Sequence, residues 1–197
     1  LILLKVEKIQ LPKHRSLPVF SAIIAAPTIF GAAILCGLED VMFVTFFPIF
    51  LIKNNLTQEL ALQYVFIALL GGILFTPIIG ILLDKYNKRL ILNITVLLIL
   101  VAPIIVCFNL DKFYLCVLFL VLWGGASSGL FVISLTMLGE RYSSSQVAGA
   151  TAILVMVFEV GSATGPIIGG KVMDTVGPDG FIYTLSALAF IFLLVSI

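Results

Sequence analysis

Charged residues are scarce in this sequence. Of its 197 residues, 11% are Asp, Glu, Lys or Arg and 61% are hydrophobic, whereas a typical soluble domain has roughly 25% charged residues. Eleven basic residues, ten acidic residues and one histidine are too few to cover the surface of a water-soluble chain of this length. The composition excludes a soluble domain and predicts an all-α membrane protein.

Residue types that carry out catalysis or bind metals are also scarce. The only histidine, His14, lies in a basic N-terminal segment, and no group of residues has metal-ligand spacing or the pattern of a nucleophile elbow. Cys36, Cys107 and Cys116 lie within or at the ends of apolar runs and act most simply as small hydrophobic residues. We therefore expect no metal, no cofactor and no enzymatic activity. The net charge of +1 gives no indication of a nucleic-acid partner, and we expect none.

Long apolar runs, each bounded by charged residues or turn signals, predict six transmembrane helices. The runs cover about 26–51, 62–83, 90–110, 113–138, 146–170 and 180–197. A spanning helix needs about 20 residues, so the chain accommodates six spans with short loops but not twelve. Residues 19–197 are therefore predicted to form a six-helix transmembrane bundle. Residues 1–18 are predicted to be a cytoplasmic linker and the end of a preceding helix, which would make the chain a piece of a longer protein.

Lysine and arginine are distributed unevenly over the two sides of this predicted bundle. Eight lie on the side of the N-terminus and three on the opposite side. The eight are Lys5, Lys8, Lys13, Arg15, Lys85, Lys88, Arg89 and Arg141, and the three are Lys53, Lys112 and Lys171. Because cytoplasmic loops carry the excess of basic residues, both termini are predicted to be cytoplasmic, in the inner membrane if the source is a bacterium.

The second and fifth runs resemble each other. The residues Pro-Ile-Ile-Gly at 77–80 are followed by Asp84, and the same four residues at 166–169 are followed by Asp174. These runs stand three places apart in the order of spans, so one crosses the membrane inward and the other outward. This relation indicates an inverted repeat of three plus three helices, the architecture of many secondary transporters. The alternative is that the two matching segments arose by chance, because short apolar segments recur in a sequence so rich in hydrophobic residues.

The loop between the second and third runs carries a recognisable spacing of glycine, aspartate and basic residues. Gly80 precedes Asp84 by four positions, and Lys85, Lys88 and Arg89 follow. A glycine one turn before an acidic residue lets two helices approach closely. This loop resembles the signature inner loop of the major facilitator superfamily, although Asn87 stands where that pattern usually has a second glycine. An ordinary cytoplasmic loop would explain the basic residues but not the spacing of glycine and aspartate.

The fifth run resembles the glycine and proline motif of the same superfamily. It contains Gly161, Gly165, Pro166, Gly169 and Gly170, and small residues four apart permit close helix packing. Residues 113–138 contain no arginine, unlike the fourth helix of many N-terminal halves of this superfamily. The resemblance therefore implies the C-terminal half of a transporter whose N-terminal six-helix half is missing from this chain.

Three acidic residues lie near the middle of apolar runs. They are Glu39 and Asp40 in the first run and Glu159 in the fifth. Placing a charge at the bilayer centre costs on the order of 3 kcal/mol, so each is expected to face a central cavity or a partner helix. Phe43 shares a helical face with Glu39, and Trp123 in the fourth run is a second candidate for the cavity. The alternative for these acids is a structural hydrogen bond between helices.

Taken with the resemblance, these patterns predict a secondary active transporter. It would move a small solute by alternating access about a site at the midplane, and midplane carboxylates would couple transport to protons. Its expected partners are the solute, protons and the lipid bilayer. A non-transporting membrane receptor or assembly protein is the alternative, and a membrane-embedded enzyme is a weaker one.

Overall fold

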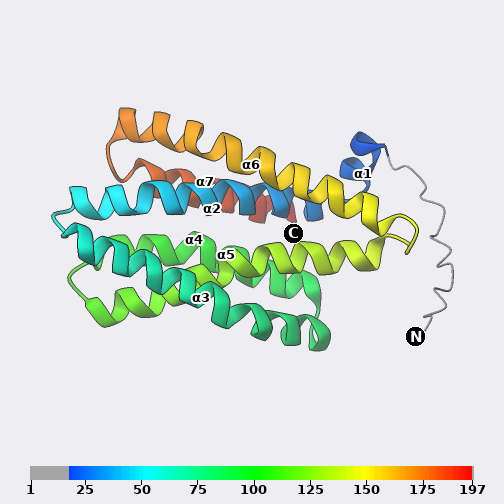
Figure 1. Ribbon diagram of the computed structural model, residues 1–197, viewed down its shortest axis with the longest axis horizontal. Coiled ribbons are helices and arrows are strands. Elements are labelled where there is room, and N and C mark those ends of the chain that lie inside the picture. The colour runs from blue at the N-terminus through cyan, green and yellow to red at the C-terminus, as the bar shows by residue number, and fades with distance from the viewer. Residues whose placement is uncertain (1–17, 197) are drawn as a thin grey trace, which may run out of the picture.

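The computed structural model describes residues 18–196, and its ribbon is shown in Figure 1. Seven helices occur in this range, in the order α1 (Val19–Ala25), α2 (Pro27–Lys53), α3 (Gln58–Lys85), α4 (Lys88–Cys107), α5 (Phe113–Arg141), α6 (Val147–Val176) and α7 (Gly180–Ser196). Each of the six apolar runs forms one of the helices α2 to α7. The predicted linker lies outside the described residues except for its last residue, Pro18.

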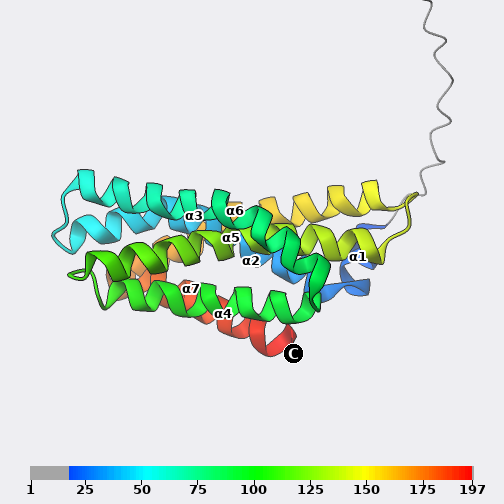
Figure 2. The same cartoon turned by 90° about the horizontal axis from the view of Figure 1, so that it is seen from below.

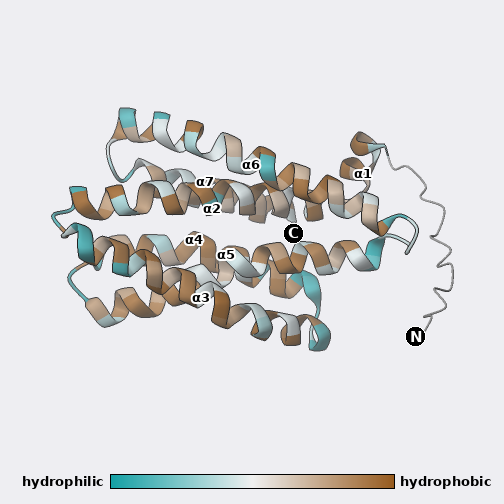
Figure 3. Cartoon of the chain, in the orientation of Figure 1, coloured by the Kyte–Doolittle hydropathy of each residue, from teal (hydrophilic) through white to brown (hydrophobic). Residues whose placement is uncertain are grey.

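The helices have the length and composition of membrane spans. Among residues 18–196, the five helices α2 to α6 are each long and apolar enough to cross a bilayer, and α7 is a shorter apolar helix. Figure 3 shows that hydrophobic residues dominate the shafts of the helices and that hydrophilic residues gather at their ends. The prediction of an all-helical membrane protein is therefore confirmed.

Local sequence signals set several helix ends. The Thr57 hydroxyl accepts a hydrogen bond from the Leu60 amide at 3.3 Å, and the Asn87 side chain accepts one from the Arg89 amide at 2.9 Å, so these residues cap α3 and α4. Gly177 ends α6 with a φ of 102°, a backbone conformation that favours glycine. The connections between the long helices are short, so consecutive helices run in alternating directions.

The long helices form two groups of three. Helix α2 packs against α6 and α7, and helix α5 packs against α3 and α4. These groups are the upper and lower halves of the bundle in Figure 1. Helix α2 contacts α5, and α4 contacts α7, across the boundary between the groups. Figure 2, in which α4 and α7 run alongside each other, shows the second of these contacts.

Glycines form the closest contact between α2 and α6. A Cβ atom on Gly161 would lie within 3.0 Å of the Ile34 carbonyl oxygen, and one on Gly165 would lie 2.8 Å from the Leu38 carbonyl oxygen. A Cβ on Gly169 would lie 2.6 Å from Cε of Met42. Gly170, in contrast, would gain an ordinary contact of 3.6 Å. Gly161 and Gly165 therefore allow the two backbones to approach, as helix pairs in lipid commonly do, whereas Gly169 makes room for the Met42 and Phe46 side chains.

Two features differ from the expectations drawn from sequence. A seven-residue helix, α1, precedes the first long helix. Tyr142 donates a hydrogen bond to the Ala22 carbonyl at 3.1 Å, and Arg141 donates one to the Ala25 carbonyl at 2.8 Å, so α1 is attached to the end of α5. Gly80 is also different, because a Cβ there would meet nothing within 4 Å. The close helix approach predicted at Gly80 does not occur among the described residues.

Candidate transport site and charged loop

Glu39 is a buried carboxylate held by two donors on another helix. Its side chain lies at the middle of α2, and only 1% of its surface is exposed. The indole Nε1 of Trp123 donates to Oε1 at 2.7 Å, and the Ser127 hydroxyl donates to Oε2. Trp123 and Ser127 are four residues apart on α5 and therefore lie on one face of that helix. Each carboxylate oxygen thus has its own donor, so α2 and α5 are joined at the centre of the bundle.

Aromatic rings enclose this hydrogen-bonded group on one side. The rings of Phe43 and Trp123 meet edge to face, with their centroids 4.7 Å apart. Phe47 is fully buried. Its ring centroid lies 5.4 Å from that of the same indole and 5.0 Å from that of Phe43, on which it stacks. Such ring pairs fix the orientation of the indole. The Trp123 N–H is consequently aimed at the carboxylate by packing as well as by the hydrogen bond.

A small cavity adjoins the Glu39 carboxylate. Its volume is about 30 Å³, which is room for about two water molecules. Its lining residues come from α2, α3 and α5, and they are Glu39, Asp40, Phe43, Ala68, Leu69, Trp123, Gly124, Ser127 and Ser128. Asp40 is exposed, whereas Glu39 is buried. The cavity therefore brings an accessible carboxylate and a buried one into the same space.

Four of the five residues proposed for the transport path meet in this cavity, and the fifth does not. Glu39, Asp40, Phe43 and Trp123 all line it. Glu159 lies on α6, its side chain is exposed, and it does not line the cavity. No described residue forms a hydrogen bond or an ion pair with Glu159.

Ser127 lines the same cavity, and its hydrogen bond to Glu39 was not indicated by the sequence. It supplies one of the two donors to Glu39, and its carbonyl oxygen accepts from the Cys36 thiol at 3.6 Å. Its position four residues after Trp123 was the available signal, because that spacing places both donors on one helical face. The identity of their acceptor depends on how α2 crosses α5, which the local sequence does not specify.

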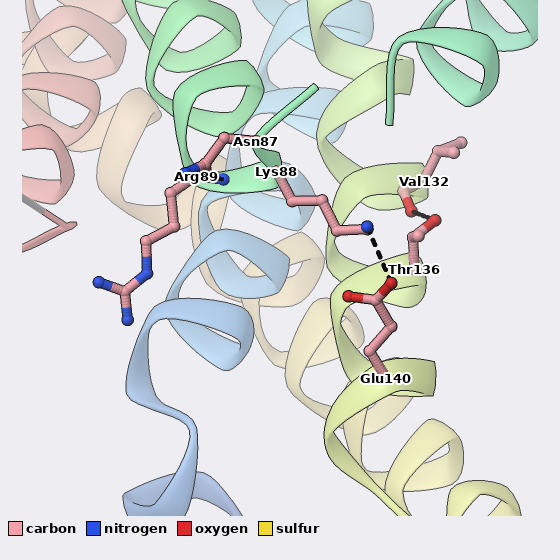
Figure 4. A network of polar contacts seen from close by, with 6 residues as sticks. All are labelled: Asn87, Lys88, Arg89, Val132, Thr136 and Glu140. Atoms are coloured by element: carbon pink, nitrogen blue, oxygen red, sulfur yellow. Dashed lines mark hydrogen bonds and ion pairs between the residues drawn. The ribbon is translucent and has the colours of Figure 1, made fainter. Parts of the chain in front are cut away.

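One ion pair joins the first residue of α4 to the end of α5. Figure 4 shows the Lys88 side chain extending toward Glu140 at the end of α5, where Nζ and Oε1 are 2.8 Å apart. The Arg89 side chain points in a different direction from that of Lys88. Asp84, Lys85 and Arg89 are exposed. No ion pair that involves them forms within residues 18–196.

Comparison with known proteins gives one match. The sequence matches the model of the family described as Major Facilitator Superfamily over residues 29–197. No curated protein and no solved structure matches the chain. The matched range contains all of the helices α3 to α7 and nearly all of α2, and the family consists of transporters rather than enzymes. The chain therefore belongs to the major facilitator superfamily and is a multi-pass membrane transporter of that type.

Proposed function

We propose that this chain is the C-terminal six-helix half of a proton-coupled secondary transporter that moves a small solute by alternating access. The single observation that carries the coupling is the Glu39 carboxylate, buried at the middle of a membrane-spanning helix and bonded by Trp123 and Ser127. Ionisable groups in such positions are costly and serve most often as ion or proton sites. The missing partner is the N-terminal six-helix half.

The packing of the helices supports an inverted repeat. If α2, α3 and α4 correspond to α5, α6 and α7, then the extensive contact between α2 and α6 corresponds to the contact between α5 and α3. Glycines close both contacts, since a Cβ on Gly71 would overlap the backbone of Val121 as one on Gly161 would overlap that of Ile34. Midplane sites at the interface of such repeats are common in secondary transporters.

Asp40 and Glu39 suggest a route for the proton. Asp40 is exposed and lines the same cavity as the buried Glu39. The cavity has room for about two water molecules, and such water would carry a proton from Asp40 to Glu39. We propose that Glu39 carries the coupling proton and that Asp40 exchanges it with the aqueous path.

Other residues fit roles that involve the missing half. Helices α3 and α6 expose much of their apolar surface, and Glu159 lies on an exposed part of α6. We propose that the N-terminal half packs against these two helices and covers Glu159. Asp84, exposed at the end of α3, would contact the same half and stabilise one of the two transport states.

The orientation rests on the distribution of basic residues. Lys85, Lys88, Arg89 and Arg141 lie at one end of the bundle. Lys53, Lys112 and Lys171 lie at the opposite end. The basic N-terminal segment adds to the first group in the sequence. We propose that this end and both termini are cytoplasmic.

A reconstitution experiment tests the coupling. The protein with both halves is placed in liposomes that contain a pH-sensitive dye, and a panel of small solutes is added in turn. We expect at least one solute to change the internal pH in the unmodified protein. The Glu39→Gln variant should lose this pH change but retain exchange of the radiolabelled solute, because glutamine keeps the volume and one acceptor oxygen but cannot titrate.

Each of the other possible results has its own interpretation. Glu159→Gln should retain the pH change, because Glu159 does not line the cavity. If Glu39→Gln retains the pH change as well, Glu39 does not carry the proton. If the unmodified protein moves none of the solutes, a receptor or an assembly protein is favoured instead.

A further inference from the structure

An open basic cavity lies at the end of the bundle, between the α3–α4 connection and helices α2, α4 and α5. Its volume is about 530 Å³. The lining residues are Ile29, Tyr86, Asn87, Lys88, Arg89, Met137, Glu140 and Arg141. This cavity is separate from the one beside Glu39, because the two have no residue in common. The part of it around Lys88 and Glu140 is shown in Figure 4.

Positive charge is in excess in this cavity. Lys88 pairs with Glu140, so these two charges offset each other. Within the described part of the chain, no carboxylate pairs with Arg89 or Arg141, and the one hydrogen bond of the Arg141 guanidinium goes to the neutral Ala25 carbonyl. Two guanidinium groups therefore line the cavity without a counter-charge from residues 18–196. Each guanidinium group presents a fork of N–H donors that suits a phosphate group.

An apolar groove begins at the same place. It lies between α3 and α4 and has a volume of about 390 Å³. Its lining residues are Phe75, Ile78, Ile79, Leu82, Tyr86, Leu90, Ile91, Ile94, Thr95, Leu98 and Ala126. Tyr86 lines both the groove and the basic cavity. The two spaces are therefore adjoining parts of one amphipathic surface.

The dimensions of the groove match one leaflet of a bilayer. From Phe75 to Lys85, at the end of α3, the helix rises about 15 Å. The hydrocarbon core of a bilayer is about 30 Å thick, so each leaflet contributes about half of that. With Tyr86 in the headgroup layer, where tyrosine is enriched, the groove would extend to about the midplane.

We propose that this surface is a binding site for one anionic phospholipid. The headgroup phosphate lies in the basic cavity between Arg89 and Arg141, and an acyl chain lies in the groove between α3 and α4. A zwitterionic lipid would fill the groove equally well, but its headgroup would be attracted less strongly by the two guanidinium groups. A free phosphate ion would bind the guanidinium groups but leave the groove empty. The proposal requires that the chain spans a bilayer and does not depend on proton coupling.

The test measures lipid preference at the groove. The full chain with Ile94→Trp is reconstituted in bilayers in which either phosphatidylglycerol or phosphatidylcholine carries brominated acyl chains, which quench the fluorescence of the new tryptophan. Ile94 is suitable because it lines the groove and is 46% exposed. The expected result is stronger quenching by phosphatidylglycerol, with a binding preference of about fivefold per engaged basic residue.

Charge variants in this background should move the preference in opposite directions. Arg89→Gln should lower it about fivefold, and Arg89→Lys should retain most of it. Glu140→Gln should raise it, because it leaves Lys88 free to engage the phosphate. Lys171→Gln, at the opposite end of the bundle, is the matched control and should leave the preference unchanged.

Three results would overturn the proposal. The first is equal quenching by both lipids in the unmodified charge background. The second is a preference that does not change in either Arg89→Gln or Glu140→Gln; because these two variants act in opposite directions, loss of folding in one still leaves the other informative. The third is a fall in phosphatidylglycerol quenching to the phosphatidylcholine level on addition of inorganic phosphate, which would show that a free anion suffices.

Discussion

Substituting Gly161 by alanine should destabilise the bundle, whereas the same substitution at Gly170 should not. Both glycines lie in α6, and both face α2. A Cβ on Gly161 would overlap the Ile34 carbonyl, which is backbone and cannot rotate away. A Cβ on Gly170 would lie 3.6 Å from Cζ of Phe46, an ordinary contact. Gly161→Ala therefore separates the two helices, and Gly170→Ala does not.

The expected difference in the free energy of unfolding between these two variants follows from two energetic contributions. Replacing glycine by alanine within a helix gains roughly 0.5–1 kcal/mol in backbone entropy, and this gain applies to both variants. Overpacking a close contact costs typically 1–3 kcal/mol, and this cost applies at Gly161 alone. The free energy of unfolding of Gly161→Ala should therefore be about 1–3 kcal/mol lower than that of Gly170→Ala.

Unfolding in mixed micelles of mild detergent and dodecyl sulfate gives this difference. Fluorescence of Trp123, the only tryptophan, reports the transition. A third variant, Gly80→Ala, should match Gly170→Ala, because open space surrounds Gly80. Equal stability of all three variants would refute the reasoning that α2 and α6 require glycine to reach their observed separation.

Three further predictions concern the site, the ion pair and the orientation. Trp123→Phe should lower the free energy of unfolding by about 1–3 kcal/mol, because one oxygen of the buried Glu39 loses its donor, and by less in a Glu39→Gln background. A double-mutant cycle of Lys88→Gln and Glu140→Gln should give a coupling energy of about 0.2–1 kcal/mol, typical of an exposed pair; a value near zero would reduce the ion pair to a packing coincidence. In a variant without native cysteines, a cysteine at Asn87 should react with an impermeant reagent only from the cytoplasmic side and one at Asn55 only from outside, and the reverse pattern would invert the proposed topology.

The sequence predicted the helices because their signals are local. Apolar runs of more than 17 residues bounded by charges specify where each long helix lies, and capping residues such as Thr57 and Asn87 specify where α3 and α4 begin. The short helix α1 was not predicted. Its attachment depends on Arg141 and Tyr142, which are more than 110 residues away in the sequence.

The candidate site was predicted as a set of residues but not as an arrangement. The cost of charge in lipid identified Glu39 and Asp40, and the resemblance to a transporter family gave them a role. The pairing of Glu39 with Trp123 and Ser127 joins positions 84 and 88 residues apart, so it depends on how α2 crosses α5. The same limit explains Gly80, whose spacing from Asp84 predicted a close contact that no described helix makes.

Infrared difference spectroscopy of the reconstituted protein tests most directly whether Glu39 takes up a proton. Spectra of the unmodified protein recorded before and after acidification should differ by the carbonyl stretches of newly protonated carboxyl groups, among them that of Glu39. The Glu39 band should be absent in Glu39→Gln, and it should persist in Glu159→Gln. An unchanged band in Glu39→Gln would contradict the account, because the titrating carboxyl would then lie elsewhere.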